Sequence, residues 1–340
     1  MSARADIIPL FIPHLGCPHL CVFCDQRRIS GAGRAATAED VQNAIMQSAA
    51  LPRSGAKRQL AFYGGSFTAI PLPQQDALLG AAADAIARGE IDSIRLSTRP
   101  DAIDESVLER LKRYGVETIE LGAQSMDDTV LTRSGRGHTA ADVERAARMI
   151  RAAGLGLVLQ MMTGLPGDSP EKDLATARAL IALRPDGVRI YPTVIVRGTE
   201  LYERWREGRY REHSVEDAVE ICAKLLPLFE QSGIPVIRLG LNPTEELSGG
   251  EAVGGAYHPA LGELVRSRIL LDRERALLRG VEAGSRVTLG TAEASLSQAI
   301  GQGRCNLKAL KDEFSLAEIK MRPSRDAEKG EIILLSIEKA

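Results

Sequence analysis

Three cysteines near the amino terminus, Cys17, Cys21 and Cys24, have the type and spacing for metal chemistry. They follow the pattern C-x3-C-x2-C within one short segment, and Phe23 directly precedes the last of them. Three thiolates can hold three irons of a four-iron, four-sulfur cube and leave the fourth iron without a protein ligand. Because that iron is free to bind a small molecule, we expect the chemistry of this chain to take place there.

A structural zinc site is the alternative for these cysteines. Zinc prefers four closed ligands, usually from paired C-x2-C knuckles. In this segment His14 or His19 would have to complete the set. We favour the iron-sulfur cluster and keep zinc as the alternative.

Length and composition agree with an intracellular enzyme. The chain has 340 residues, 44% of them hydrophobic and 26% charged, so it can bury the core of one large domain plus a small one. The net charge of -2 gives no overall attraction to nucleic acid or to a membrane, so such a contact needs a local patch. Met1–Leu10 lacks a long apolar run, which excludes a signal peptide and a membrane span. We expect a cytoplasmic, oxygen-sensitive protein.

Short aliphatic segments alternate with longer amphipathic ones from residue 7 to about residue 240. This alternation predicts the α/β class, with parallel strands joined by helices, and we expect a partial (β/α)6 TIM-like barrel over residues 1–240. The expected strands are Ile7–Ile12, Gln59–Tyr63, Ile91–Ser97, Val116–Ala123, Leu155–Met161 and Gly187–Tyr191, with Val236–Leu241 as a candidate seventh. The expected helices cover about 39–50, 74–88, 104–114, 140–153, 170–183 and 214–232.

Polar and glycine-rich residues follow the predicted strands one after another. The cysteine segment comes after the first strand, Gly64–Ser66 after the second and Gly164–Gly167 after the fifth. In such barrels the chemistry sits at the carboxyl ends of the strands, where loops vary without disturbing the packed interior. One rim of the barrel therefore collects the candidate site residues, and packing alone gives no reason for this distribution.

The carboxyl-terminal part of the chain predicts a connector over residues 241–283 and a small α+β domain over residues 284–340. The tight turn Gly301–Arg304 separates the two helices of that domain. Its expected elements are strand Arg286–Leu289, helix Ala292–Ile300, helix Cys305–Phe314, strand Glu318–Met321 and strand Glu331–Ile337.

The cysteine pattern resembles that of the radical S-adenosylmethionine (SAM) superfamily. The resemblance implies that the amino and carboxylate groups of SAM chelate the open iron of a [4Fe-4S] cluster held by Cys17, Cys21 and Cys24. It also implies reductive cleavage of SAM to methionine and a 5′-deoxyadenosyl radical, which takes a hydrogen atom from the substrate. An electron donor such as ferredoxin or flavodoxin would then be a partner.

Motifs after the strands bring the resemblance closer. From about residue 7 to 240 the chain is similar to the radical SAM half of the catalytic subunit of Elongator, a family that modifies the wobble uridine of transfer RNA. We expect no counterpart here of that subunit's acetyltransferase domain and basic amino-terminal extension, so acetyl transfer is not carried over. The matching motifs are Glu120–Ser125, Arg136–Thr139, Met162–Gly167, Arg184–Asp186, Ile190–Thr193 and Arg197–Thr199.

Gly64, Gly65 and Ser66 follow the cysteines by one barrel unit and are candidates for SAM binding. Glycine lets the backbone approach a ligand closely, and exposed carbonyl and amide groups can hold the amino group of SAM. The segment Gly249–Glu251 matches the commoner wording of the superfamily's glycine motif. Because it follows the last barrel strand, we interpret it as a loop.

The other cofactor-binding candidates are polar side chains on or just after barrel strands. Arg99 could pair with the carboxylate of SAM, or with Asp101 or Glu120 in a structural ion pair. Glu120 and Gln124 fall on one face of a strand and reach the adenosyl group if that face is the interior. Gln160 either contacts SAM or substrate or is a satisfied interior amide. Arg189 lies where SAM or a substrate phosphate could meet it.

Several further residues have local interpretations. We expect Arg136 and His138 to be connector residues. Asp168 and Ser169 are expected to cap the next helix, which Pro170 opens at its first turn.

The turn Gly301-Gln302-Gly303-Arg304 resembles the G-x-x-G turn of the KH module of RNA-binding proteins, whose amides contact the phosphates of a single strand. Here Arg304 stands where the last glycine belongs. Arg304, Lys308 and Lys311 form one basic helix face, which attracts phosphate. The alternative is a degenerate βααβ lid whose charges are only solvated.

Together these features predict a radical SAM enzyme that modifies RNA, with a transfer-RNA-like substrate. One alternative is a radical SAM enzyme acting on a small-molecule metabolite, since related barrels act on porphyrin precursors. Another is a non-catalytic RNA-binding protein with a structural metal site.

Overall fold

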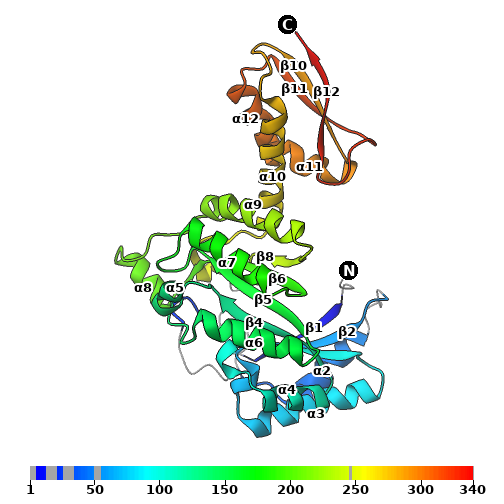
Figure 1. Cartoon of the computed structure of the whole chain (residues 1–340), viewed down its shortest axis with the longest axis vertical. Coiled ribbons are helices and arrows are strands. Elements are labelled where there is room, and N and C mark those ends of the chain that lie inside the picture. Colours follow the sequence, from blue (N-terminus) through cyan, green and yellow to red (C-terminus); the bar gives the residue numbers. More distant parts are fainter. Residues whose placement is uncertain (1–4, 13–20, 26–33, 50–54, 245–246, 340) are drawn as a thin grey trace. The chain divides into compact units, whose positions relative to one another are not determined.

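The structure is a computed structural model that describes residues 5–12, 21–25, 34–49, 55–244 and 247–339 (Figure 1). The chain divides into two compact units. The first unit comprises Met1–Ala218 and Leu225–Pro259, and the second comprises Val219–Lys224 and Ala260–Ala340. The predicted connector is therefore divided between the two units.

A seven-stranded parallel sheet forms the centre of the first unit and curls into a half-barrel (Figure 1). The strands follow one another in space in the order of the chain, which confirms the α/β class and the partial TIM-like barrel. They are β1 (Asp6–Ile12), β2 (Arg58–Gly64), β3 (Ser93–Thr98), β4 (Val116–Gln124), β5 (Gly156–Thr163), β6 (Gly187–Pro192) and β8 (Val236–Leu239).

Strand β3 shows how the alternation of side chains builds this sheet. Ile94 and Leu96 are fully buried on one face, as expected for a strand covered by helices. Between them Arg95 points the other way, into the barrel interior, where it contacts Glu120. The interior of the half-barrel is therefore partly polar.

Six helices follow the strands within two residues of the predicted ranges. Their starts have local causes: Asp104 accepts a hydrogen bond from the amide of Val107, and Thr139 and Asp142 form a capping box. The predicted cap at Ser169 is confirmed, with Pro170 at the first helical position. The helices are α2 (Ala38–Ala49), α3 (Leu72–Ala87), α4 (Glu105–Arg113), α6 (Ala140–Ala152), α7 (Pro170–Ala182) and α9 (Val215–Gln231).

The first unit also contains short elements that were not expected, among them two helices and two strands. Helices α5 (Asp128–Arg133) and α8 (Glu200–Arg206) lie in loops after β4 and β6. Strand β7 (Val194–Val196) pairs antiparallel with β9 (Ala252–Gly255), which belongs to the predicted connector. None of these four elements is longer than seven residues, which is too short for a clear periodic signal in the sequence.

The second unit contains a three-stranded sheet in the order β11-β10-β12, with β10 parallel to β11 and antiparallel to β12. Leu270 and Leu278 of the long helix α10 belong to the same hydrophobic core as Val287, Leu289 and Leu310. Helix α10 is thus part of this unit. The elements are α10 (Leu261–Leu278), β10 (Arg286–Thr291), α11 (Leu296–Ile300), α12 (Cys305–Glu313), β11 (Glu318–Pro323) and β12 (Ile332–Glu338).

Glu274 of α10 lies one helical turn from both Leu270 and Leu278 and is fully buried. Neither of its carboxyl oxygens has a hydrogen-bond partner within the described residues. Burial raises the pKa of Glu274 to about 8, although the charge of Arg275 opposes the shift. The side chain is therefore protonated at neutral pH in the folded unit.

This buried acid should make the stability of the second unit depend on pH. Between about pH 5 and pH 8 the folded unit keeps a proton that the unfolded chain releases, so the free energy of unfolding should fall by about 1.4 kcal/mol per pH unit as pH rises. Glu274→Gln should remove this slope, and the exposed Glu293 offers a matched control in Glu293→Gln. Urea unfolding at several pH values measures this slope for both variants. Hydrogen exchange of the α10 amides serves as the probe of unfolding. A Glu274→Gln variant with the wild-type slope would contradict the assignment.

Candidate functional site

Two of the three cysteines lie in the described segment Cys21–Asp25, and Cys17 lies outside the described residues. Main-chain hydrogen bonds hold the segment on both sides of Val22: its amide donates to the carbonyl of Ser134 at 3.1 Å, and its carbonyl accepts from the amide of Leu201 at 2.7 Å. The side chain of Val22 is buried with Ile195 and Leu201. The cysteine segment is therefore anchored to the rest of the first unit.

The two described cysteines fit a cluster site. The amide of Cys24 donates to the carbonyl of Cys21 at 3.0 Å, so both thiols belong to one tight turn after β1. Cys21 is buried, whereas Cys24 is partly exposed. A thiol pair of this kind suits soft metal centres such as iron-sulfur clusters. Within the described residues no group of three His, Cys, Asp or Glu side chains is close enough to hold a metal ion.

Arg136 lies in the loop that connects α5 to α6, as expected of a connector residue, and it also contacts the cysteine turn directly. Its Nη1 donates to Sγ of Cys21 at 3.3 Å, and its Nη2 donates to the carbonyl of Gly122 at 2.7 Å. His138 is also buried, and its Nε2 lies 3.2 Å from the carbonyl of Ala123. Burial lowers the pKa of His138 to about 4, and the charge of Arg136 adds to this effect. His138 is therefore neutral at physiological pH.

The glycine loop after β2 lies next to β1. Gly64 has a φ of 102°, a conformation that favours glycine. The amide of Gly65 donates to the carbonyl of Ile12 at 2.7 Å. The buried Ser66 hydroxyl lies 3.0 Å from the hydroxyl of Thr98 and accepts from the amide of Arg99 at 3.2 Å. Ser66 thus joins the ends of β2 and β3.

Arg99 is buried and makes the ion pair that was one of its two predicted roles. Its Nε donates to Asp101 at 2.9 Å, and its Nη2 donates to the carbonyl of Arg136 at 2.6 Å. Nη1 has no partner within the described residues. The guanidinium therefore holds the Arg136 loop and keeps one donor available.

Glu120 of β4 is the centre of a polar network inside the half-barrel. Arg95 Nη1 donates to its Oε1 at 3.0 Å, and Arg189 Nε lies 2.8 Å from its Oε2. The hydroxyl of Tyr63 and the amide of Gln160 also donate to this carboxylate, at 3.0 Å and 3.1 Å. The structure therefore brings together three predicted residues, Glu120, Gln160 and Arg189, and adds Tyr63 and Arg95, which carry no sequence signal beyond their place on strands.

The charges of this network are unequal. Burial alone would raise the pKa of Glu120, but the guanidinium groups of Arg189 and Arg95 outweigh it and hold the pKa below its usual value. Glu120 is thus ionised between two cations. Its side chain has no exposed surface, whereas those of Arg95 and Arg189 are 12% and 14% exposed. The network therefore presents excess positive charge to the barrel interior.

Gln124 ends β4 in an unusual conformation, with a φ of 65°. The β4–β5 register shifts between Gly122 and Gln124. Its amide lies against Gly122, and its buried Oε1 has no partner within the described residues. The side chain of Gln124 thus lies close to that of Arg136, because both lie against Gly122.

The loop after β5 is held from two sides. Gly164 has a φ of 71°, and a Cβ there would lie 2.1 Å from the ring of His213. Its carbonyl accepts from the hydroxyl of Tyr210 at 2.6 Å. Burial, together with the neighbouring Asp168, raises the pKa of Asp173 to about 10, so this carboxyl keeps its proton and can donate it to Asp168. These contacts fix the loop after β5 at the rim of the half-barrel.

The predicted nucleic-acid residues lie on one turn of the second unit. Gly301 and Gly303 have φ values of 75° and 59°, and Arg304 has a φ of 65°. Gly303, Arg304 and Lys308 are exposed, whereas Gly301 is buried against Asn306. Nδ2 of Asn306 donates to the carbonyl of Ala299 at 3.1 Å, which fixes the turn between α11 and α12.

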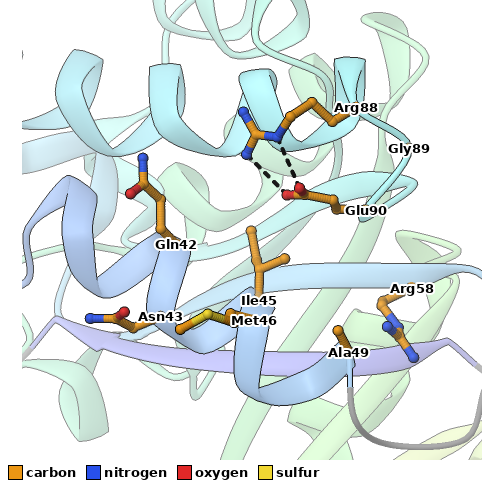
Figure 2. Close-up of a pocket in the computed structure, with 9 residues that line it drawn as sticks. All are labelled: Gln42, Asn43, Ile45, Met46, Ala49, Arg58, Arg88, Gly89 and Glu90. Carbon is orange, nitrogen blue, oxygen red and sulfur yellow. Dashed lines mark hydrogen bonds and ion pairs between the residues drawn. The ribbon is translucent and has the colours of Figure 1, made fainter.

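A cavity of about 730 Å³ lies in the first unit and is lined by residues of α2, the start of β2 and the segment between α3 and β3 (Figure 2). Arg58 begins β2 and Glu90 precedes β3, so the cavity belongs to the amino ends of the strands. Figure 2 shows Arg88 turned toward Glu90, with which it forms an ion pair of 2.9 Å. The cavity contains none of the predicted site residues.

Comparison with known protein families gives two matches. The Radical SAM superfamily matches residues 11–180, and the radical SAM carboxyl-terminal domain matches residues 185–270. The first match includes all three cysteines, the glycine loop and the Glu120 and Gln160 positions.

Curated relatives are similar to the barrel part of the chain. The tRNA uridine(34) acetyltransferase of Dehalococcoides mccartyi is 35% identical in an alignment 174 residues long, which covers 45% of this chain and 38% of that protein. Elongator complex protein 3 of Homo sapiens is 31% identical over 204 residues, 54% of this chain and 37% of that protein. The aligned part is thus less than two fifths of the length of either relative.

A solved structure shares the fold. The archaeal Methanocaldococcus infernus Elp3 with an amino-terminal deletion superposes with a TM-score of 0.64 at 22% identity, over 84% of this chain and 67% of that one. No helix within the described residues is both long and apolar enough to span a bilayer.

Loss of Glu120 should destabilise the first unit strongly. Glu120→Ala leaves two buried guanidinium groups without their carboxylate, and we expect a loss of about 3–5 kcal/mol in the free energy of unfolding. Glu117→Ala on the same strand removes an exposed ion pair with Lys57 and should cost less than about 1 kcal/mol. Urea denaturation of the two variants measures the difference. Equal losses would show that the interior network does not stabilise the barrel.

Proposed function

Since the chain belongs to the radical SAM superfamily, we propose that it is an enzyme that modifies RNA, with transfer RNA as the substrate class. Its cofactors are a [4Fe-4S] cluster and SAM, and an electron donor is required for such chemistry. We further propose that ferredoxin or flavodoxin is this donor and that the enzyme acts in the cytoplasm.

In this proposal Cys17, Cys21 and Cys24 hold the cluster. When bound, the cluster supplies an electron that cleaves SAM to methionine and a 5′-deoxyadenosyl radical, which takes a hydrogen atom from the substrate. The anchoring of Val22 supports the assignment, because it fixes the turn that contains two of these thiols before any ligand arrives. The rim loops exclude water and oxygen from the radical.

We assign the polar rim and interior residues to SAM. The excess positive charge of Arg95 and Arg189 over Glu120 suits a carboxylate or another anion in the half-barrel. The carbonyl groups of Gly64 and Gly65 suit its amino group, and Ser66 fixes the loop that carries them. Arg99, with one donor without a partner, and the side chains of Gln124 and Gln160 are the remaining candidates.

The substrate proposal depends mainly on the relatives, two groups of which are named for transfer RNA uridine(34) acetylation and for Elongator. The second unit adds a local reason. Arg304 and Lys308 are exposed beside a glycine turn whose tip, at Gly303, has no heavy atom within 4 Å of an added Cβ. Such a turn leaves room for a phosphate backbone, and the two cations would attract it.

Single replacement of Cys17, Cys21 or Cys24 by alanine should abolish both the cluster and SAM cleavage. The anaerobically reconstituted wild type should hold about four irons and four sulfides, because three thiolates suffice for a site-differentiated cube. Cys222→Ala, at a buried cysteine of α9, is the matched control and should behave like the wild type. Iron and sulfide analysis and 5′-deoxyadenosine release measure both properties. If one of the three cysteine variants retained both the cluster and SAM cleavage, the replaced cysteine would not be a cluster ligand.

The substrate class is tested by anaerobic incubation of the full chain with SAM, a reductant and deproteinised cell RNA. We expect 5′-deoxyadenosine together with a new modified nucleoside in the transfer RNA fraction. Arg304→Glu with Lys308→Glu should weaken RNA binding by at least about tenfold and reduce its dependence on salt, because two phosphate contacts are lost. SAM cleavage without RNA should stay at the wild-type level.

The matched control reverses two other exposed cations of the second unit, Arg325→Glu with Lys329→Glu, and should leave RNA binding unchanged. Equal weakening by both double variants would assign the effect to net charge and not to the turn. SAM cleavage that RNA never stimulates, with no modified nucleoside, would instead favour a small-molecule substrate.

A further inference from the structure

Arg136 is the described cation that touches a cluster cysteine. Its Nη1 donates to Sγ of Cys21 at 3.3 Å, and its Nη2 donates to the carbonyl of Gly122 at 2.7 Å. The side chain is only 7% exposed. The sulfur therefore receives a hydrogen bond from a guanidinium group that water scarcely reaches.

Main-chain contacts fix the two groups relative to one another. The amide of Arg136 donates to the carbonyl of Leu131 at 3.0 Å, and its own carbonyl accepts from Arg99 Nη2 at 2.6 Å. Two residues earlier, the carbonyl of Ser134 accepts from the amide of Val22, the residue after Cys21. The loop of Arg136 is thus docked on the cysteine turn independently of the contact between guanidinium and sulfur.

Within the described residues Arg136 has no carboxylate partner. Its hydrogen bonds go to a thiol and a carbonyl, its buried Nε has no partner, and the nearby Asp101 pairs with Arg99. An unpaired buried cation is costly, so its position is best explained by an anionic group that the cysteines bring. A [4Fe-4S] core in its oxidised state with three thiolates carries about one negative charge, and one-electron reduction adds another.

We propose that Arg136 is a positioning residue for the cluster, whose charge and hydrogen bond to Cys21 raise the cluster's reduction potential. The inference depends on the cluster assigned above to Cys17, Cys21 and Cys24. A fixed positive charge beside a ligand sulfur stabilises the more negative, reduced state more than the oxidised one. In this way Arg136 makes it easier for the electron donor to reduce the cluster.

The test compares the midpoint potentials of reconstituted proteins with equal iron and sulfide content. The electron paramagnetic resonance signal of the reduced cluster is the readout of each titration. Arg136→Met should shift the midpoint to a more negative potential, Arg136→Gln should shift it in the same direction, and Arg136→Lys should restore part of the difference. The control Arg110→Met removes a partly buried guanidinium of α4 that pairs with Asp76 of α3. The midpoint potential of this variant should equal that of the wild type. Equal midpoints for wild type, Arg136→Gln and Arg136→Met would overturn the proposal.

A measurement on the wild type covers the case in which the Arg136 variants do not fold or load. Iron-sulfur stretching modes in resonance Raman spectra should shift between H₂O and D₂O, because an N–H group donates to a ligand sulfur. Identical spectra in the two solvents would overturn the hydrogen bond and with it the proposal. Absence of any cluster in the wild type would instead overturn the assignment of the three cysteines, so the two failures are distinguishable.

Discussion

One buried carboxylate connects the strands on which the candidate site depends. Glu120 of β4 contacts Tyr63 of β2, Arg95 of β3, Gln160 of β5 and Arg189 of β6, so a single side chain bridges five adjacent parallel strands. Its charge is tolerated in the interior because all these partners are present together. The stagger of the strands at the rim, and so the relative positions of the loops that carry the site, are constrained from inside the barrel.

Features decided by neighbouring residues were predictable from the sequence. The start of α7 follows from Ser169 and Pro170, which cap and open the helix within two positions. The seven strands follow from short aliphatic segments between amphipathic helices, and the sequential parallel order follows from that alternation. Glu120, Gln160 and Arg189 each lie on a predicted strand, but the contacts among them depend on the pairing of β4, β5 and β6.

Features decided by distant residues were not predictable. Arg136 and Cys21 are 115 positions apart, and nothing near Arg136 in the sequence indicates a sulfur partner. The register shift at Gln124 depends on the pairing of β4 with β5, so the alternation along a single strand did not predict it. Because α10 is rich in charged residues, its sequence did not indicate that Leu270 and Leu278 belong to the core of the second unit.

The anchoring of the cysteine turn determines the order of events during synthesis. The cysteines leave the ribosome early, yet the groups that hold Val22, the carbonyl of Ser134 and the amide of Leu201, are made much later. The turn can therefore take its packed form only after the chain has been translated through α8. The side chain of Val22 also packs with Ile195 and Leu201, so the apolar contacts of this segment form equally late in synthesis.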